Sequence, residues 1–208
     1  MKDIFVERGK AGDSLSAAFR REGKKPLAAS FATPLGTMAA IACGDRLISL
    51  SFLDPEGWTR ENDSIRRRRP ARRGEDEPEA GENSAIRSLR KELADYFAGR
   101  LRRFATPVAF FGTPFQLSVW KELRRVPFGE TISYLELARR IGHPRAVRAV
   151  GQANGANRLP ILAPCHRVIA NDGGLGGFSS GLERKKWLLE FEKGRRFGTR
   201  RGEGSRHE

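Results

Sequence analysis

Hydrophobic and polar residues alternate most regularly in the first quarter of the chain. Ile48, Leu50 and Phe52 alternate with two serines, which is the period-two pattern of a strand with one buried face. Two similar segments precede it and are bounded by proline and glycine turns. The pattern predicts a small antiparallel sheet with strands over 28–32, 37–43 and 46–53.

Helical spacing of apolar residues begins further along the chain. The first such segment runs from Ile86 to Phe97, and Gly99 is placed to cap its C-terminus. Thr113 followed by Pro114 is typical of a helix N-terminus, because proline fits the first helical position. We therefore expect strands first and helices afterwards, an α+β arrangement.

Two adjacent short helices are expected in the second half. The four residues that begin with Ser133 form a capping box, and their helix runs to Gly142. Pro144 then opens another helix, which would carry Arg145 and Arg148 among small residues that allow close approach to a partner. This outline is typical of a helix-turn-helix, and it is also common in ordinary helical folds.

A dense charge block separates the two patterns. Six arginines within Arg66–Arg73 precede five acids that end at Glu82, with prolines among them. Such a segment cannot bury apolar surface, so a solvated loop is favoured over a phosphate-binding patch. The predicted organisation is an extension (1–25), a first domain (26–108) with a charged loop (62–84), a second domain (109–194) and a basic tail (195–208).

Composition narrows the class of protein. Lys and Arg total 39 against 25 Asp and Glu, and the formal net charge of +14 favours a polyanionic partner. No apolar run is long enough to span a membrane, and no signal-peptide pattern is present, so we expect neither a membrane protein nor export. Two cysteines and three histidines predict neither a disulfide scaffold nor a zinc cluster, and a reducing compartment fits best.

Cys165 is the candidate for reactive chemistry. A cysteine among apolar neighbours is commonly a small buried hydrophobe. Here, however, His166 and Arg167 follow it, and cationic neighbours lower a thiol pKa. Pro164 interrupts regular structure just before it, which predicts a turn rather than a strand.

A carboxylate further along could complete this site. A last helix is predicted from a capping-box pattern at Ser180 to Gly194. Its apolar stripe consists of Leu182, Leu188 and Leu189. Glu192 falls within the same stripe, and a buried carboxylate needs a partner. Glu192 therefore either frays into solvent at the helix end or pairs with His166 and holds it as a base for Cys165.

With these motifs in place, the chain closely resembles the O6-alkylguanine-DNA alkyltransferases, also called methylated-DNA–protein-cysteine methyltransferases. The resemblance rests on PCHRV at 164–168, the preceding RAVRAVGQANGAN and the following GLERKKWLLEFE. It runs from Phe110 to Lys193, and more weakly includes ATPLGTMAAIACGDRLISLSFLD and LADYFAGR. It implies an α+β fold with a small antiparallel ribonuclease-H-like N-terminal domain and a helical, winged-helix-like C-terminal domain that contains a helix-turn-helix.

The resemblance also implies roles at the reaction centre. Cys165 would accept the alkyl group, His166 would take its proton through a water molecule, and Glu192 would orient His166. Asn157 would bridge the helix-turn-helix to the cysteine turn. Tyr134 would lie beside the flipped base and donate a proton to guanine N3.

Further residues are implied in DNA and base binding. Arg148 would fill the gap left by the extruded base, and Ser179 would hydrogen-bond to guanine O6. The backbone at Val168 would read the base edge, and Ser133 and Arg145 would contact the DNA. The family docks its helix-turn-helix in the minor groove of double-stranded DNA.

The implied activity is a single, irreversible transfer from O6-alkylguanine or O4-alkylthymine to the protein's own cysteine, by a cytoplasmic monomer without metal or cofactor. Phe178 stands where the family usually has Tyr, and Ser180 where glycine is common, so the pocket rim differs. Two alternatives remain. One is a damage sensor that binds without transfer, and the other is a cysteine hydrolase whose base would be His143 or His207.

Overall fold

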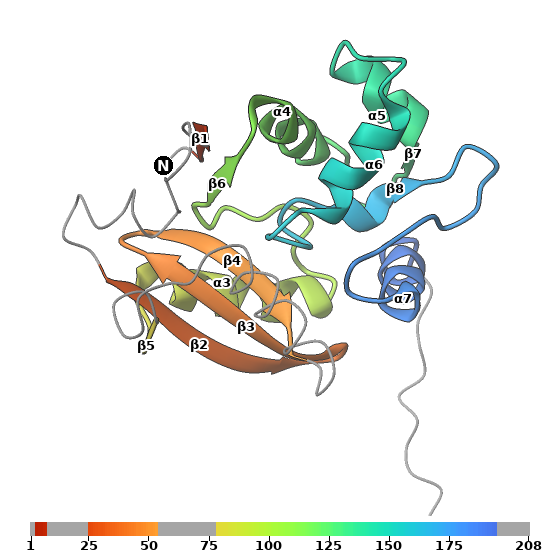
Figure 1. The fold of residues 1–208 in the computed structure, drawn as a ribbon. Coiled ribbons are helices and arrows are strands. Elements are labelled where there is room, and N and C mark those ends of the chain that lie inside the picture. Colours follow the sequence, from red (N-terminus) through yellow and green to blue (C-terminus); the bar gives the residue numbers. More distant parts are fainter. Residues whose placement is uncertain (1–2, 8–24, 54–77, 195–208) are drawn as a thin grey trace, which may run out of the picture.

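A computed structural model of the chain describes residues 3–7, 25–53 and 78–194 (Figure 1). The predicted arginine block Arg66–Arg73 and the basic tail 195–208 therefore lie outside the described residues. No helix within the described segments is long and apolar enough to cross a membrane.

The first half folds as a four-stranded sheet in the order β4-β3-β2-β5, with α3 packed on one face (Figure 1). Strands β2, β3 and β4 are antiparallel neighbours, and the short β5 runs parallel to β2. The elements are β2 (Pro26–Thr33), β3 (Gly36–Cys43), β4 (Arg46–Phe52), β5 (Glu79–Ala80) and α3 (Ser84–Phe97). The three strands and the helix expected from the sequence are confirmed, whereas the expected charged loop (62–84) is interrupted by β5 and the start of α3.

A β-bulge modifies the alternation in β4. The register shifts between Ile41 and Ala42, so that Ala42 pairs with Leu47 and Ile41 with Ser49. The extra residue, Ile48, consequently leaves the main core and packs in a small separate cluster. The sequence pattern placed it on the same face as Leu50, which was wrong.

The predicted loose extension (1–25) needs a correction at its start. Strand β1 (Ile4–Glu7) pairs in parallel with β6 (Ala109–Gly112). Phe5 stacks on Phe110 with ring centroids 5.0 Å apart, which gives the strand an apolar anchor. Pairing with a distant strand is not visible in a local pattern, and this explains the miss.

The second half is helical (Figure 1). It contains α4 (Pro114–Leu123), α5 (Tyr134–Arg140), α6 (Val147–Gly155) and α7 (Leu182–Glu192). A parallel pair of two-residue strands, β7 (Ile132–Ser133) and β8 (Val168–Ile169), joins its parts. Helices α5 and α6 are the expected helix-turn-helix.

Capping follows the predictions at some helices only. Thr113 and Gln116 form a complete capping box at α4, and Ser133 accepts a hydrogen bond from the Glu136 backbone at α5. At α7 the prediction was wrong, because the helix begins after Gly181, whose φ of +96° suits glycine, and no side chain caps it.

Two residues lie elsewhere than the periodicity placed them. Leu182, expected in the apolar stripe of α7, is 48% exposed because it occupies the first turn, beyond the helix's contact with the core. Arg145 precedes α6 instead of lying on it, because the residues after Pro144 form a turn.

The two halves share one hydrophobic core, which extends from Met38 in the sheet to Leu188 in α7. Backbone hydrogen bonds also link them, for example from the Leu50 amide to the Arg158 carbonyl at 2.8 Å. The fold is the expected α+β arrangement, and its halves are held together by packing as well as by the chain.

The contact between Trp120 on α4 and helix α6 allows a test of how tightly this core is packed. Its indole donates to the Ala153 carbonyl of α6 at 2.8 Å, and a Cβ added at Gly112 would lie 2.6 Å from its ring. Because the indole is buried and hydrogen-bonded, it cannot give way. We expect Gly112→Ala to lower the free energy of unfolding by about 1–3 kcal/mol in denaturant titrations.

Gly155→Ala is the matched control. A Cβ at this exposed last residue of α6 meets no atom within 4 Å. Its stability should be unchanged or slightly higher, since alanine restricts the unfolded chain. Equal losses in the two variants would contradict the packing argument.

Candidate functional site

Cys165 begins a single helical turn, Cys165–Arg167, directly after Pro164, which confirms the expected turn. The preceding loop is strained, because Ile161 has a φ of +71°, unusual for a β-branched residue. The cysteine is only 2% exposed. Its sulfur therefore lies inside the protein, at the end of a tightly constrained loop.

Asn157 holds that loop from the end of α6. Its amide nitrogen donates to the Ala163 carbonyl at 2.7 Å and lies 3.1 Å from the Cys165 sulfur. Its side-chain oxygen accepts from the Leu159 amide at 3.0 Å. Asn157 thus connects the helix-turn-helix to the cysteine turn, in the place that the resemblance implied.

His166 and Glu192 form a buried pair. The His166 Nε2 atom lies 3.0 Å from Glu192 Oε1, and both side chains are almost completely buried. Glu192 therefore does not fray into solvent, although it is the last residue of α7. With the carboxylate ionised, Nε2 donates and Nδ1 is left as the proton-accepting nitrogen. Nδ1 makes no hydrogen bond to any described residue.

Glu192 has partners that the sequence did not reveal. The Arg167 guanidinium donates one hydrogen bond to each carboxylate oxygen, both at 2.8 Å, and the Gly129 amide donates to Oε2 at 3.1 Å. The Tyr96 hydroxyl, on α3, donates to Oε1 at 2.6 Å. The arginine was visible in the motif but was assigned to the thiol, whereas no local signal pointed to Tyr96.

These contacts fix the charges of the pair. Burial acts to raise the pKa of Glu192, but hydrogen bonds and charges from His166 and Arg167 outweigh it and hold that pKa far below its ordinary range. Burial lowers the pKa of His166 despite the attraction of Glu192. At neutral pH the site therefore contains a carboxylate beside a neutral imidazole.

The Cys165 thiol differs from expectation. Burial raises its pKa, although the Asn157 hydrogen bond and the Lys185 charge act in the opposite direction. The predicted lowering by His166 and Arg167 was wrong, because the imidazole is neutral and the guanidinium is bound to Glu192. The resting sulfur is a thiol that needs a base.

Tyr134 is the first residue of α5 and contributes a phenol to the site. Its hydroxyl donates to the Gly177 carbonyl at 3.4 Å, and the loop is so close that a Cβ at Gly176 would lie 2.8 Å from the ring. Burial and the nearby Cys165 raise the pKa of Tyr134, so the phenol keeps its proton. It is a fixed donor close to the sulfur.

Lys185 is a buried cation, and no sequence pattern pointed to it. Its ammonium donates to the Val168 carbonyl at 2.6 Å and the Gly177 carbonyl at 3.2 Å, and burial lowers its pKa to about 8. It ties the loop that carries Ser179 to β8. Ser179 itself is exposed, while Val168 is fully buried and donates its amide to the Cys165 carbonyl.

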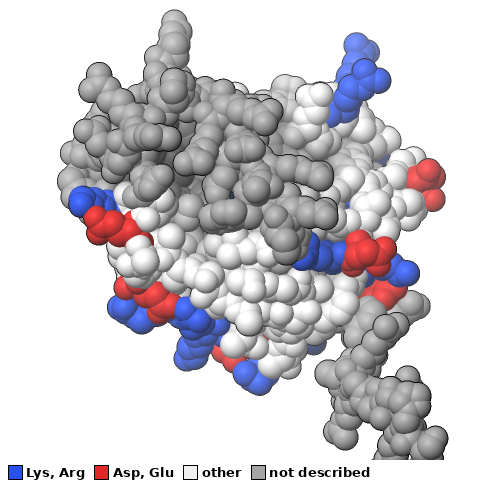
Figure 2. Space-filling model, turned by 60° about the horizontal axis from the view of Figure 1, so that its bottom comes forward, with Lys and Arg blue, Asp and Glu red and all other residues white. Residues whose placement is uncertain are grey.

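The implied DNA-contacting residues are more exposed than this buried centre. Arg148 on α6 and Arg145 in the preceding turn are exposed, and Ser133 is half-buried as the N-cap of α5. On the face that Figure 2 shows, the described Lys and Arg lie beside Asp and Glu around an uncharged area. The described positive side chains do not form one continuous patch on that face.

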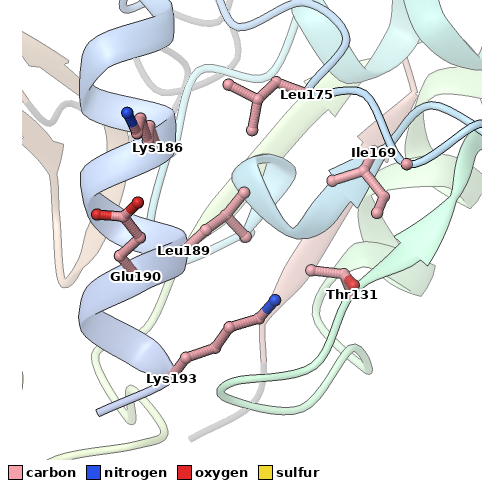
Figure 3. A pocket seen from close by; sticks show the side chains of 8 residues that line it. Thr131, Ile169, Leu175, Lys186, Leu189, Glu190 and Lys193 are labelled. Carbon is pink, nitrogen blue, oxygen red and sulfur yellow. The ribbon is translucent and has the colours of Figure 1, made fainter. Parts of the chain in front are cut away.

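A separate hollow of about 330 Å³ lies between α7 and β8 (Figure 3). Side chains of Ile169, Leu175 and Leu189 form its apolar wall, and Lys186 of α7 and Lys193, just after α7, extend beside it. Neither Cys165 nor His166 lines it. It is not the place where the buried sulfur would meet a substrate.

Comparison with known proteins agrees with this geometry. A family model described as the 6-O-methylguanine DNA methyltransferase DNA-binding domain matches residues 114–194, and the ribonuclease-like domain of the same protein matches 27–110. The constitutive methylated-DNA–protein-cysteine methyltransferase of Bacillus subtilis is 40% identical over 162 residues, which are 77% of this chain and 92% of that protein. The chain belongs to the methylated-DNA–protein-cysteine methyltransferase family.

Other members of this methyltransferase family agree. A relative from Methanosarcina barkeri is 50% identical over 108 residues, 52% of this chain and 68% of its own. The crystal structure of Mycobacterium tuberculosis OGT in complex with DNA superposes with a TM-score of 0.68 at 36% identity, covering 81% of this chain and 93% of that one. The ribonuclease-H-like and DNA-binding domains implied by the sequence are therefore confirmed as family domains.

Arg167 provides a test of the charge pairing in this methyltransferase fold. Arg167→Ala removes the cation that grips buried Glu192, and unpairing a buried ion pair costs about 3–5 kcal/mol. We expect a loss of this size in the free energy of unfolding from chemical denaturation.

Arg140→Ala is the control for this prediction. Arg140 pairs with Glu136 one helical turn away on an exposed surface, and such pairs contribute about 0.3–0.5 kcal/mol. A loss at Arg167 no larger than the loss at Arg140 would mean that the buried contacts do not stabilise the fold.

Proposed function

We propose that this chain repairs alkylated DNA by moving the alkyl group from O6 of guanine, or O4 of thymine, onto the sulfur of Cys165. The observation that carries the proposal is the buried chain of contacts from Glu192 to His166 beside Cys165, in a member of this methyltransferase family. The proposed substrate is double-stranded DNA with an alkylated base.

In the transfer, the S–H bond of Cys165 is replaced by a bond between the sulfur and the alkyl carbon. His166 Nδ1 takes the thiol proton, directly or through a water molecule, and Glu192 stabilises the imidazolium that forms. The sulfur of Cys165 attacks the alkyl carbon, and the bond from that carbon to the base oxygen breaks. Tyr134 donates a proton to the leaving purine at N3. The Tyr134 phenolate then recovers a proton from the His166 imidazolium through water, so that overall the thiol proton replaces the alkyl group on the base.

The buried thiol makes the base necessary. Because burial raises the pKa of Cys165, the thiolate forms only as His166 receives the proton. The Asn157 amide, 3.1 Å from the sulfur, can donate to the developing charge. We propose that Ser179 and the backbone at Val168 hold the base while this occurs.

DNA binding is assigned to the helix-turn-helix. A base inside a duplex cannot reach a buried sulfur, so the nucleotide must be flipped out at a cost of a few kcal/mol. We propose that Arg148 occupies the vacated stack, with α6 in the minor groove, and that Arg145 and Ser133 contact the DNA around it. Small residues on α6 such as Gly151 allow the helix to lie close to the groove.

We further propose that the protein acts as a monomer in the cytoplasm, without metal or cofactor. A reducing compartment keeps Cys165 as a thiol. The thioether product has no neighbouring cysteine to regenerate it among the described residues, since Cys43 lies on β3. Each molecule therefore reacts once.

Cys165→Ser tests the acceptor. After incubation with DNA that contains O6-methylguanine, the wild-type chain should gain one methyl group in place of a hydrogen, in one-to-one ratio with repaired base. The serine variant should gain nothing and still bind the DNA, because the phosphate contacts remain. Intact-protein and peptide mass spectrometry measure both.

Cys43→Ala is the control and should react like the wild type, because Cys43 is buried on β3 far along the chain from the motif. Binding by the wild type without any mass gain would identify a damage sensor. Repair of more than one base per molecule would identify a turnover enzyme. Either result would overturn the proposal.

Arg148→Ala tests base extrusion. Its transfer rate should fall by about tenfold or more on duplex substrate, which corresponds to about 1.4 kcal/mol, and much less on single-stranded substrate. Single-turnover rates at saturating DNA measure the difference.

Arg139→Ala serves as the control, since Arg139 is exposed on α5 outside the proposed stack contact. It should weaken binding to both substrates and leave the saturated rate unchanged. Equal rate losses on duplex and single strands for the Arg148 variant would reduce that residue to a phosphate contact.

A further inference from the structure

Tyr96 connects the ribonuclease-like domain to the candidate reaction centre. It lies on α3, within the residues that match that domain, and its side chain is fully buried. Its hydroxyl donates to Glu192 Oε1 at 2.6 Å, the same oxygen that accepts from His166 and Arg167. The hydroxyl is therefore one contact away from the proposed base.

This hydroxyl is not needed to hold the carboxylate in place. Arg167 binds both oxygens of Glu192, and the Gly129 amide binds Oε2. A bidentate arginine together with a backbone amide fixes a carboxylate in position and in plane. The Tyr96 hydroxyl instead stabilises part of the negative charge on Oε1, the carboxylate oxygen that faces His166.

We infer that Tyr96 lowers the proton affinity of His166 by stabilising the negative charge of Glu192 through a hydrogen bond. It thereby helps to keep the imidazole unprotonated and able to accept the thiol proton. Tyr96 is a positioning residue in this sense, because it acts through Glu192 and does not touch the reacting atoms. The inference rests on the proposed function for its catalytic consequence, and on the structure alone for its effect on His166.

The charges around His166 support this role. Glu192 from α7 is the charged group that attracts a proton to the imidazole, whereas Arg167 and Lys185 repel it. Cys165 precedes His166 as a neutral thiol, and Tyr96 faces the carboxylate from α3 as a neutral phenol. Any change in the charge density of Glu192 Oε1 is therefore passed directly to His166.

The direction of the effect follows from these charges. A hydrogen-bond donor stabilises a carboxylate and makes it a weaker partner for a second proton donor. Removing the Tyr96 hydroxyl leaves more charge on Glu192 Oε1, which favours the imidazolium and raises the pKa of His166. A protonated His166 cannot accept the thiol proton. Transfer should therefore fail at a higher pH than in the wild type.

Tyr96→Phe in the full chain tests the inference. The single-turnover rate of transfer from O6-methylguanine duplex DNA is measured against pH, together with NMR titration of the labelled His166 imidazole in the free protein. The midpoint of the acidic limb and the pKa of His166 should both rise by about 0.5–1 unit.

A second variant has the opposite expected sign. Tyr96→3-fluorotyrosine keeps the shape of the ring but makes the hydroxyl a stronger donor. The same two readouts should move downwards. A purely structural role of Tyr96 does not produce opposite shifts from two nearly isosteric side chains.

Phe104→Leu is the packing control. Phe104 lies against Tyr96 with ring centroids 5.4 Å apart and carries no polar atom. It should lower the Tm and leave both pH midpoints unchanged. A Tyr96→Phe variant with unchanged midpoints, or a Phe104 variant that shifts them equally, would overturn the inference.

The two proposals fail in different ways. A wild-type chain that transfers no alkyl group would overturn the proposed function, and the NMR pKa of His166 would still test the tuning by Tyr96. A wild type that transfers the group, with an unshifted His166 in the Tyr96→Phe variant, would overturn only the tuning.

Discussion

The structure depends on one buried negative charge. The Glu192 carboxylate accepts five hydrogen bonds, from Tyr96, Gly129, His166 and twice from Arg167. An unpaired carboxylate in the interior would be very costly, so α7 packs where hydrogen-bond donors surround Glu192. The donors come from α3, from the loop before β7 and from the cysteine turn. A single side chain thus requires three separate parts of the chain to meet in one arrangement.

The same constraint decides the chemistry of the sulfur. With its charge satisfied, Glu192 stays ionised and leaves His166 neutral, while the buried Cys165 remains a thiol. The site therefore stores no thiolate that could react with other electrophiles in the cell. In the proposed transfer, proton removal from Cys165 and attack on the alkyl carbon would occur together, because separated charges are unfavourable in a buried site. Packing around Cys165 and the contact from Asn157 also mean that an added alkyl group must displace neighbours.

How much of this could be predicted from sequence depends on the distance between partners. The order of strands and helices, the turn at Cys165 and the inward angle of Glu192 follow from local periodicity and were expected. The bulge that moves Ile48 out of the core and the β1–β6 pairing depend on neighbours far along the chain. Tyr96 is 96 positions from Glu192 and looks like an ordinary apolar-face residue of α3. The buried cation at Lys185 was missed because lysine is normally exposed, and only its carbonyl partners explain its position.

The thiol pKa shows why a correct motif still gave a wrong electrostatic conclusion. Their adjacency in sequence suggested that His166 and Arg167 would lower the pKa of Cys165 as cations, but the His166 Nε2 atom and the Arg167 guanidinium bind Glu192. Residues that are adjacent in sequence need not have interacting side chains, because the fold determines which charged groups come together. In this molecule the fold directs the Arg167 guanidinium and the His166 N–H to the carboxylate, and the sulfur is left with burial, the Asn157 amide and the Lys185 ammonium. Tyr96 on α3 belongs to the matched ribonuclease-like domain and donates a hydrogen bond to Glu192. The site therefore includes residues from both matched domains.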